Sequence, residues 1–273
     1  MDAIKHISSI QNPEIRQLQH WSQKSRDRRK SGVFVLEGYR ELGLALQGGY
    51  RIRMLYYCPE ILGDERRQAL SDRAGCSWVS LSPEVYSHLA YRGKTEGVIG
   101  LVEAREHRLQ DLELEGKNPL ILVAQAPEKP GNLGALLRTA DAASLDAVIV
   151  ADLKGDLYNP NVIRSSVGCL FTVPVAQAST EEALAYLKAR DIAVYAASLG
   201  GSVRYDQADY LGASAIAVGT EATGLTEAWT RQAEACVEIP MAGAIDSMNV
   251  SVAAAVLLFE ARRQRGFENI TNP

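Results

Sequence analysis

Apolar and polar residues alternate along the first third of the chain in a repeated strand–helix order. Apolar positions such as Ile15 and Leu18 recur at helical spacing within 8–30, which predicts one helix there. Short apolar runs and amphipathic stretches then follow in turn. We expect strands at 32–36, 51–57, 77–81 and 97–102, and helices at 38–47, 65–74 and 83–90. This pattern predicts a small α/β domain over residues 1–106.

A polar, charge-rich stretch separates this domain from a second alternation, and we expect residues 107–118 to be a linker. Several strands of the second alternation are apolar without interruption, as in Ile121–Ala124. Such strands are typical of a parallel sheet covered by helices on both faces. The expected catalytic domain is 119–273, with strands at 120–126, 146–151, 171–176, 192–198, 213–218 and 235–239, and helices at 132–144, 179–189, 224–233 and 249–265.

Composition narrows the class of protein. The 273 residues, 47% of them hydrophobic, suit two domains. We expect no membrane association, because no apolar run reaches the ~18–20 residues of a membrane span, and we expect no signal peptide at the N-terminus. The four cysteines form no Cys-x-x-Cys pair and the four histidines all precede residue 108. These features favour free thiols, a cytoplasmic location and chemistry without a metal.

Charge is divided unevenly between the two parts. The net charge is −4, but residues 1–106 hold 16 Lys/Arg against 13 Asp/Glu, whereas the rest holds 13 against 20. The densest basic cluster is at 24–30. It fits either a solvated helix face or a patch that contacts phosphates. The residues of this cluster that we assign to a phosphate patch are Arg26, Arg28, Arg29 and Lys30.

Three separated segments place Gly, Asn and Ser next to expected strand ends or helix starts. The first reads Asn-x-Gly-x-x-x-Arg-Thr-Ala and begins at Asn132. The second reads Gly-x-Glu-x-x-Gly-Leu from Gly219, and the third combines Ile-Pro-Met at 239–241 with Asp-Ser-x-Asn-Val-Ser at 246–251. Helix starts leave backbone N–H groups unpaired, and glycines allow a ligand to approach the backbone closely. Such ends bind ligands readily.

Taken in this order, the three segments resemble the signature motifs of the SpoU (TrmH-like) RNA 2′-O-ribose methyltransferases of the SPOUT superfamily. The resemblance covers roughly 120–265 and implies S-adenosylmethionine as the cofactor. It also implies a deep trefoil knot, which strand patterning alone would not suggest, and a homodimer. The stretch Val33–Gly38 resembles, over a shorter length, the start of the substrate-binding domain that precedes the catalytic domain in many such enzymes.

The resemblance assigns roles residue by residue. It implies that Arg138 acts on the target ribose, that Asn132 orients it and that Ser247 lies near the ribose. The expected catalytic residues are Asn132, Arg138, Glu221, Ser247 and Asn249. The expected cofactor-binding residues are Leu199, Gly219, Thr220, Gly224, Ile239, Met241 and Met248. Arg164 is a further candidate for contact with RNA or with the partner subunit.

Simpler explanations exist for several of these residues taken singly. Asn132 fits a helix N-cap, Arg138 fits an ion pair with Asp141 at i+3, and the two glycines fit a turn. The favoured function is methylation of a ribose 2′-hydroxyl in structured RNA, rRNA rather than tRNA. The alternatives are a tRNA 2′-O-methyltransferase, a catalytically silent RNA-binding protein of the same fold and a nucleotide-binding oxidoreductase. The oxidoreductase is disfavoured because no Gly-x-Gly-x-x-Gly turn follows the first strand of either domain.

Overall fold

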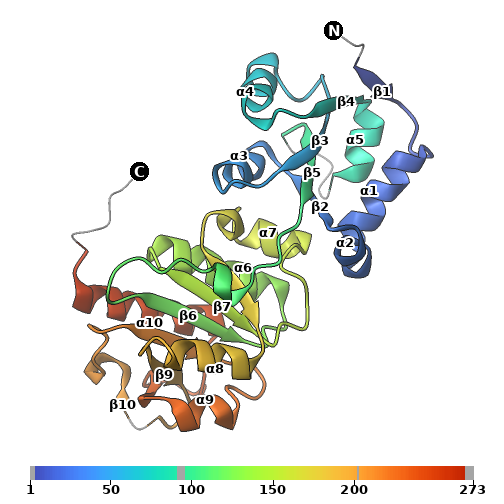
Figure 1. The fold of residues 1–273 in the computed structure, drawn as a ribbon. Coiled ribbons are helices and arrows are strands. Elements are labelled where there is room, and N and C mark those ends of the chain that lie inside the picture. Colours follow the sequence, from blue (N-terminus) through green and yellow to red (C-terminus); the bar gives the residue numbers. More distant parts are fainter. Residues whose placement is uncertain (1–3, 91–95, 202, 268–273) are drawn as a thin grey trace. The chain divides into compact units, whose positions relative to one another are not determined.

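The computed structural model describes residues 4–90, 96–201 and 203–267, and the extreme ends of the two expected domains lie outside these ranges. The chain forms two compact units, coloured along the sequence in Figure 1. Unit 1 consists of Met1–Arg105 and Asp156–Thr172, and unit 2 consists of Glu106–Gly155 and Val173–Pro273. The division differs from the expected one because Asp156–Thr172, within the second alternation, belongs to unit 1.

Unit 1 is built on a five-stranded mixed sheet. The strand order is β1-β4-β3-β5-β2, in which β5 runs antiparallel to β3 and β2 and the other pairs are parallel. The strands are β1 (Lys5–Ile7), β2 (Val33–Glu37), β3 (Ile52–Tyr57), β4 (Ser77–Leu81) and β5 (Val98–Glu103). The helices are α1 (Pro13–Gln23), α2 (Ser25–Ser31), α3 (Tyr39–Gln47), α4 (Asp64–Ala74), α5 (Pro83–Leu89) and α7 (Pro160–Ser165).

The predicted helix over 8–30 is wrong as one element. The helix α1 begins at Pro13, where the Asn12 side chain accepts a hydrogen bond from the Glu14 amide at 2.9 Å. It ends at Gln23, and the extended backbone of Lys24 (φ −114°, ψ 111°) separates it from α2. A proline at the first helical position and an Asn cap account for the later start.

An aromatic cluster explains why Asp156–Thr172 belongs to unit 1. The rings of Phe34 and Tyr158 stack at 4.2 Å between centroids, and Phe171 stacks on Phe34 at 5.9 Å. The Tyr50 ring meets Phe171 edge-on at 5.1 Å, and all four residues are buried. The predicted strand over 171–176 is therefore displaced. Phe171 ends a short 3₁₀ turn (Cys169–Phe171), and the strand starts after Pro174, which has no N–H to donate.

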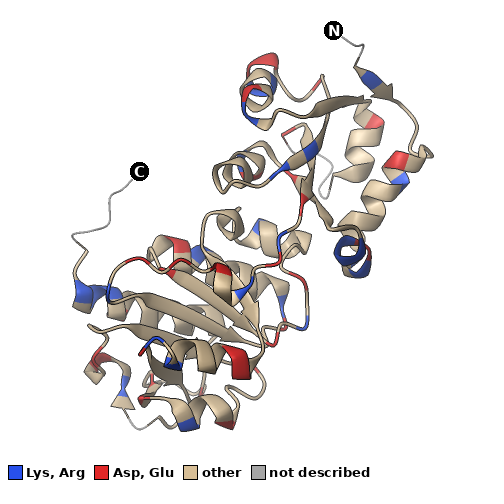
Figure 2. Cartoon of the chain, viewed as in Figure 1, with Lys and Arg blue, Asp and Glu red and all other residues tan. Residues whose placement is uncertain are grey.

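Unit 2 is a seven-stranded sheet in which every pairing is parallel. The strand order is β10-β12-β9-β11-β6-β7-β8. The three adjacent strands β11, β6 and β7 are buried at every residue and carry no charged residue (Figure 2). The strands are β6 (Leu120–Gln125), β7 (Ala147–Ala151), β8 (Val175–Ala178), β9 (Ala193–Ala197), β10 (Val203–Arg204), β11 (Ser214–Val218) and β12 (Ala235–Glu238).

Helices cover both faces of this sheet, as the continuous apolar strands predicted. The helices α6 and α10 pack against each other on one face, and α8 and α9 lie on the other. Their bounds are α6 (Pro130–Ala142), α8 (Thr180–Lys188), α9 (Glu227–Gln232) and α10 (Val250–Arg265). Because all strands are parallel, the loops that follow β6, β9, β11 and β12 meet at one edge of the sheet.

Candidate functional site

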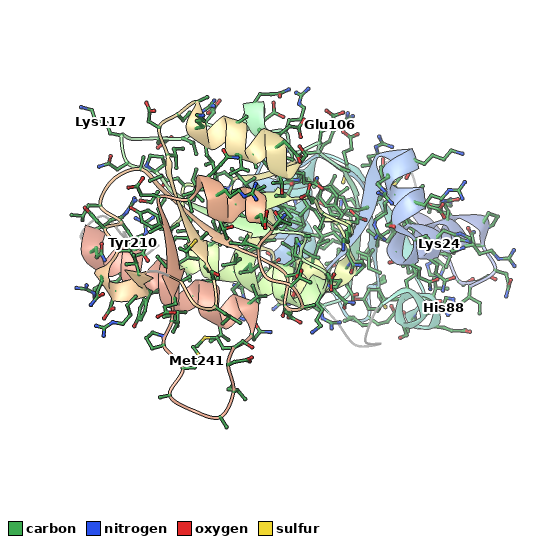
Figure 3. All side chains as sticks on the ribbon, turned by 90° about the horizontal axis from the view of Figure 1, so that it is seen from below. Lys24, His88, Glu106, Lys117, Tyr210 and Met241 are labelled. Carbon is green, nitrogen blue, oxygen red and sulfur yellow. The ribbon has the colours of Figure 1, made fainter. Side chains whose placement is uncertain are left out.

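A cavity of about 850 Å³ lies at the carboxyl edge of the unit 2 sheet. Its walls are the ends of β9 and β11, the loops after β11 and β12, and the first turns of α10. Met241, labelled in Figure 3, belongs to the loop between β12 and α10. The lining is mostly apolar side chains and main chain, with a few polar groups. This size and lining are typical of sites for small organic ligands.

The loop after β11 is a tight hairpin held by its own backbone. Thr220 and Gly224 exchange two N–H···O hydrogen bonds of 3.1 Å, and the Thr220 hydroxyl accepts a bond from the Thr223 amide at 3.0 Å. Gly224 has a φ of +68°, which favours glycine. A Cβ on Gly219 would lie 2.1 Å from the Gly224 carbonyl carbon and 2.3 Å from the Leu225 nitrogen. The sequence of this loop is therefore dictated by close backbone contact.

The loop before α10 ends in a capped helix start. The Asn249 side chain accepts hydrogen bonds from the Ser251 amide at 3.0 Å and from the Ser251 hydroxyl at 2.6 Å. Ser247 donates to the Asp246 carboxylate at 3.2 Å, and both residues are exposed. The apolar residues that follow, from Val250 to Leu257, place this helix start against the cavity.

A chain of polar contacts joins the three motif segments beside the cavity. The Lys129 ammonium pairs with Glu221, and the Asn132 side-chain amide donates to the other carboxylate oxygen of Glu221. Asn249 in turn donates from Nδ2 to the side-chain oxygen Oδ1 of Asn132 at 3.2 Å. The hydrogen bond from Lys129, with a smaller contribution from Asn132, holds the pKa of Glu221 below its usual value. An ionised Glu221 thus fixes which way the Asn132 amide points.

The N-cap explanation of Asn132 is wrong. The helix α6 begins two residues earlier at Pro130, so Asn132 lies within its first turn with its side chain directed to Glu221 and Asn249. Proline at the first helical position accounts for the earlier start, because its fixed φ suits that place.

Two further polar residues were not expected from the sequence, Lys129 in the cavity wall and Gln125 at the end of β6. Lys129 directly precedes Pro130 and contributes the only cation among the described residues that line the cavity. Gln125 is the last residue of β6, and its buried amide bonds Thr180 at 3.1 Å and Thr226 at 3.0 Å, while accepting from the Thr226 amide at 2.9 Å. A polar residue at the end of an otherwise apolar strand is a signal that could have identified it.

The structure brings most of the expected site residues together. The cavity lining includes all seven expected cofactor-binding residues, and also Glu221, Ser247 and Asn249. Asn132 reaches them through its hydrogen bonds. Arg138 does not line the cavity: it is exposed on α6, and no described residue gives its guanidinium a hydrogen bond or an ion pair.

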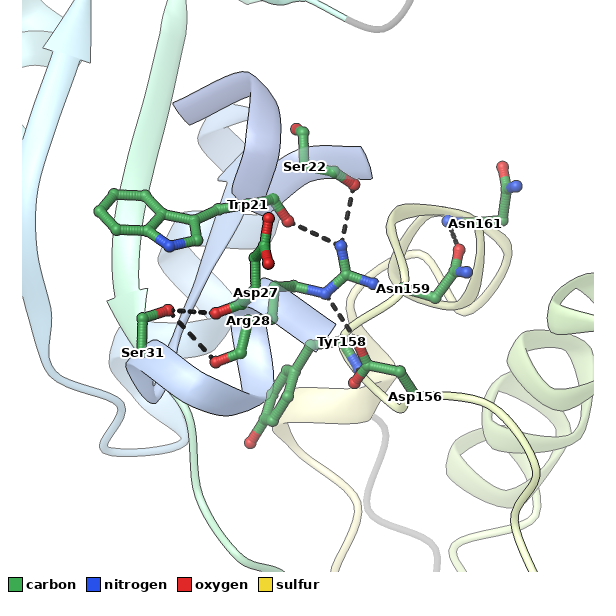
Figure 4. A network of polar contacts seen from close by, with 9 residues as sticks. All are labelled: Trp21, Ser22, Asp27, Arg28, Ser31, Asp156, Tyr158, Asn159 and Asn161. Atoms are coloured by element: carbon green, nitrogen blue, oxygen red, sulfur yellow. Dashed lines mark hydrogen bonds and ion pairs between the residues drawn. The ribbon is translucent and has the colours of Figure 1, made fainter. Parts of the chain in front are cut away.

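The basic cluster near the N-terminus is not uniform. Arg26, Arg29 and Lys30 are exposed on α2, and Arg164 is exposed on α7. Arg28 is instead buried, with its side chain 3% exposed. Its Nε pairs with the Asp156 carboxylate at 2.6 Å, and its Nη1 donates to the carbonyl oxygens of Trp21 and Ser22 at 2.7 and 2.9 Å (Figure 4).

The assignment of Arg28 to RNA binding is therefore corrected. A guanidinium whose donors are committed to a buried carboxylate and two carbonyl groups has a structural role and cannot reach a phosphate.

The same described ranges contain no cluster of three or more His, Cys, Asp or Glu side chains able to hold a metal ion. Within them, no helix combines the length and apolar character needed to cross a bilayer.

Comparison with known proteins assigns the family. Residues 119–259 match the SpoU rRNA Methylase family, and residues 12–100 match the MRM3-like substrate binding domain. The chain belongs to the SpoU rRNA methylase family. It is 28% identical over 270 residues to the 23S rRNA (uridine(2479)-2′-O)-methyltransferase of Streptomyces viridochromogenes, covering 96% of this chain and 93% of that protein. It is 34% identical to the 23S rRNA (guanosine-2′-O-)-methyltransferase RlmB of Vibrio cholerae, covering 71% and 80%.

Solved structures agree with this assignment. A crystal structure described as an RNA 2′-O ribose methyltransferase is 38% identical, with a TM-score of 0.82 and coverage of 95% of this chain and 99% of that one. An AdoMet-bound rRNA methyltransferase from Sinorhizobium meliloti is 30% identical, with a TM-score of 0.86 and coverage of 95% and 98%. The cavity in unit 2 fits such a cofactor, because the hairpin after β11 lines it with main chain and Ile239, Met241 and Leu199 supply apolar walls.

Proposed function

We propose that this protein transfers the methyl group of S-adenosylmethionine to the 2′-hydroxyl of a ribose in rRNA. The observation that carries the proposal is the convergence of the three motif segments on one cavity, joined by the chain of contacts from Lys129 to Asn249. Family membership supports the reaction class, and the 23S rRNA substrates of the relatives support the choice of rRNA.

The cofactor would be held mainly by main chain and apolar side chains. The residues proposed to bind it are Leu199, Gly219, Thr220, Gly224, Ile239, Met241 and Met248. When bound, S-adenosylmethionine supplies an electrophilic methyl group on a sulfonium. The task of the protein is then to align the ribose oxygen with that methyl group and to exclude water. A site of amides, one carboxylate and apolar walls suits this task.

Arg138 is proposed to act on the target ribose by electrostatics. A guanidinium has a pKa above ~12 and is a poor general base. Arg138 would stabilise the negative charge that develops on the 2′-oxygen and bind the neighbouring phosphate, which takes the proton. Its side chain is exposed on α6, where the guanidinium can reach a bound RNA. Asn132, Glu221 and Asn249 would hold the geometry, and Ser247 would lie beside the ribose.

RNA docking is proposed for residues 1–106, with 107–118 as the linker and 119–273 as the catalytic domain. The match of 12–100 to a substrate-binding domain supports this division. The exposed cations Arg26, Arg29, Lys30 and Arg164 would contact RNA phosphates. Since Asp156–Thr172 packs within unit 1, part of the docking surface comes from the second alternation.

A homodimer, a trefoil knot and a cytoplasmic location complete the proposal. One face of α10 exposes Val252 at 52% and Phe259 at 41%, seven residues apart and therefore on the same side of the helix. An exposed apolar stripe of this kind favours contact with a second copy of the chain. In such a dimer, residues of the partner subunit would lie next to Arg138. The knot would involve the loops that line the cofactor cavity. Light scattering, which measures the molar mass in solution, would test whether the protein is a dimer.

The experiment is to map ribose methylation across rRNA from cells that contain or lack this protein. We expect one 2′-O-methylated position to be lost without the protein and restored by the wild-type chain. Restoration by Arg138→Ala would contradict the role of Arg138. Loss of a tRNA modification alone would make the protein a tRNA enzyme, and no change in either RNA would favour a catalytically silent binding protein.

A further inference from the structure

Unit 1 contains a second cavity, of about 720 Å³, that the proposed reaction does not use. It lies between α1, the end of β2, the start of α3, the end of α5 and α7, all of which belong to unit 1. Its walls include apolar side chains such as Val35, Leu89 and Ile163. Its volume is within the range of about 300–1,000 Å³ typical of small-ligand sites.

The charged side chains among the described lining residues of this cavity are mostly acidic. Glu37, Glu41 and Glu96 all line it, whereas Arg164 is the only Lys or Arg among its described lining residues. Three carboxylates repel phosphate groups, so the interior is unsuited to the RNA backbone. A cavity with this charge in an RNA-docking unit is instead suited to a base that presents hydrogen-bond donors.

Glu41 is the carboxylate that such a ligand can engage, since the hydrogen bond that it accepts among the described residues comes from its own backbone amide. Glu96 already accepts hydrogen bonds from the backbone amides of Tyr39 at 2.7 Å and Arg40 at 3.3 Å, at the start of α3. Glu41 is half-buried and forms no ion pair with any described residue. Burial, the largest cause, raises the pKa of Glu41; a hydrogen bond from its own backbone amide opposes this increase, and the charge of Glu96 adds to it. A ligand with two adjacent N–H donors would relieve this desolvation.

We propose that this cavity binds one unstacked guanine of the RNA substrate, with the Glu41 carboxylate accepting hydrogen bonds from its N1–H and N2–H groups. Guanine alone among the four bases presents two neighbouring donors on its Watson–Crick edge, which match the two oxygens of a carboxylate. The apolar walls cover the faces of the base, and the exposed Arg164 contacts a phosphate next to it. This inference rests on the proposed function for its RNA substrate, and it concerns a docking base rather than the methylated nucleotide.

The test measures the binding of short RNAs to the full-length protein by fluorescence anisotropy. The probes are a labelled hexauridylate in which one residue is replaced by guanosine, by inosine, which lacks the 2-amino group, or by adenosine. We expect guanosine to bind more tightly than inosine, and inosine more tightly than adenosine. Glu41→Gln should weaken binding of the guanosine probe by roughly tenfold or more, because one acceptor becomes a donor that faces a donor.

Glu65→Gln is the matched control, since Glu65 is an exposed carboxylate on α4 of the same unit and does not line the cavity. It removes the same charge and should leave the preference for guanosine intact. Affinity for S-adenosylhomocysteine, measured by calorimetry, should be unchanged in both variants and reports on folding. Because no readout requires methyl transfer, failure of the proposed reaction would be distinguished from failure of this inference.

Equal binding of the three probes by the wild-type protein would overturn the proposal, as would an undiminished preference in Glu41→Gln. The last measurement is a competition between free guanosine 5′-monophosphate and the labelled guanosine probe. If the free nucleotide displaces the guanosine probe only weakly, the cavity binds a base that RNA presents. If the free nucleotide binds more tightly than the guanosine probe, the cavity is a site for a free nucleotide, and the proposed role in RNA docking is overturned.

Discussion

Gly219→Ala tests whether the hairpin after β11 shapes the cofactor cavity. An added Cβ would lie 2.1 to 2.3 Å from the Gly224 carbonyl group and the Leu225 nitrogen, whereas ordinary contact begins near 3.4 Å. All three nearest atoms are backbone, so no side chain can rotate away. The hairpin would have to open by about 1 Å, which is enough to break hydrogen bonds of normal length.

The magnitude follows from the bonds that would be lost. Opening the hairpin breaks the two 3.1 Å bonds between Thr220 and Gly224. At about 0.5–1.5 kcal/mol for each bond, the bound conformation of the loop would be destabilised by about 1–3 kcal/mol. This corresponds to roughly a 5- to 150-fold weaker affinity for S-adenosylhomocysteine. The strands beneath the loop are untouched, so the fold should persist.

The assay is calorimetric titration with S-adenosylhomocysteine, accompanied by thermal unfolding. Gly243→Ala is the control, because Gly243 lies in the loop before α10, has no atom within 4 Å of an added Cβ and does not have a positive φ. Gly243→Ala should bind S-adenosylhomocysteine with wild-type affinity. If Gly219→Ala also bound with wild-type affinity while remaining folded, the hairpin would not form a wall of the cofactor site.

Three further predictions concern the charged residues. Arg138→Ala should abolish methyl transfer but leave affinity for S-adenosylhomocysteine unchanged, and a large loss of that affinity would show that Arg138 has another role. Lys129→Met should raise the pKa of Glu221, since Lys129 is what lowers it, so the acid limb of the pH–rate profile should move to higher pH; an unmoved limb would refute the coupling. Asp156→Ala leaves the Arg28 guanidinium buried without its carboxylate, and should reduce the free energy of unfolding by about 3–5 kcal/mol. Urea denaturation measures this change, and wild-type stability of the variant would show that the Arg28–Asp156 pair does not stabilise the fold.

The site in unit 2 could be predicted because its parts follow strand ends. In a parallel sheet the carboxyl ends of the strands meet at one edge, so Asn132, Gly219 and Ser247 were expected to converge although long stretches of chain separate them. Each motif also has local physical causes that can be read in the sequence, such as Pro130 at a helix start and Asn249 as a helix cap.

Features that depend on tertiary partners could not be predicted. Arg28 lies in a charge run that fits a solvated helix face, and only its contact with Asp156, 128 residues away, makes it buried. Phe171 fitted a strand by local pattern, but the aromatic cluster with Phe34 holds it in a 3₁₀ turn of unit 1. Lys129 had no local signal, because its role arises from Glu221 on another loop.

The most direct test of the proposed reaction is nucleoside analysis of rRNA incubated with the purified protein and S-adenosylmethionine that carries an isotopically labelled methyl group. We expect all label in the digested RNA to appear as one 2′-O-methylnucleoside, and Arg138→Ala to transfer none. Label on a base instead of a ribose, or no label in RNA although the protein binds both ligands, would contradict the proposed reaction.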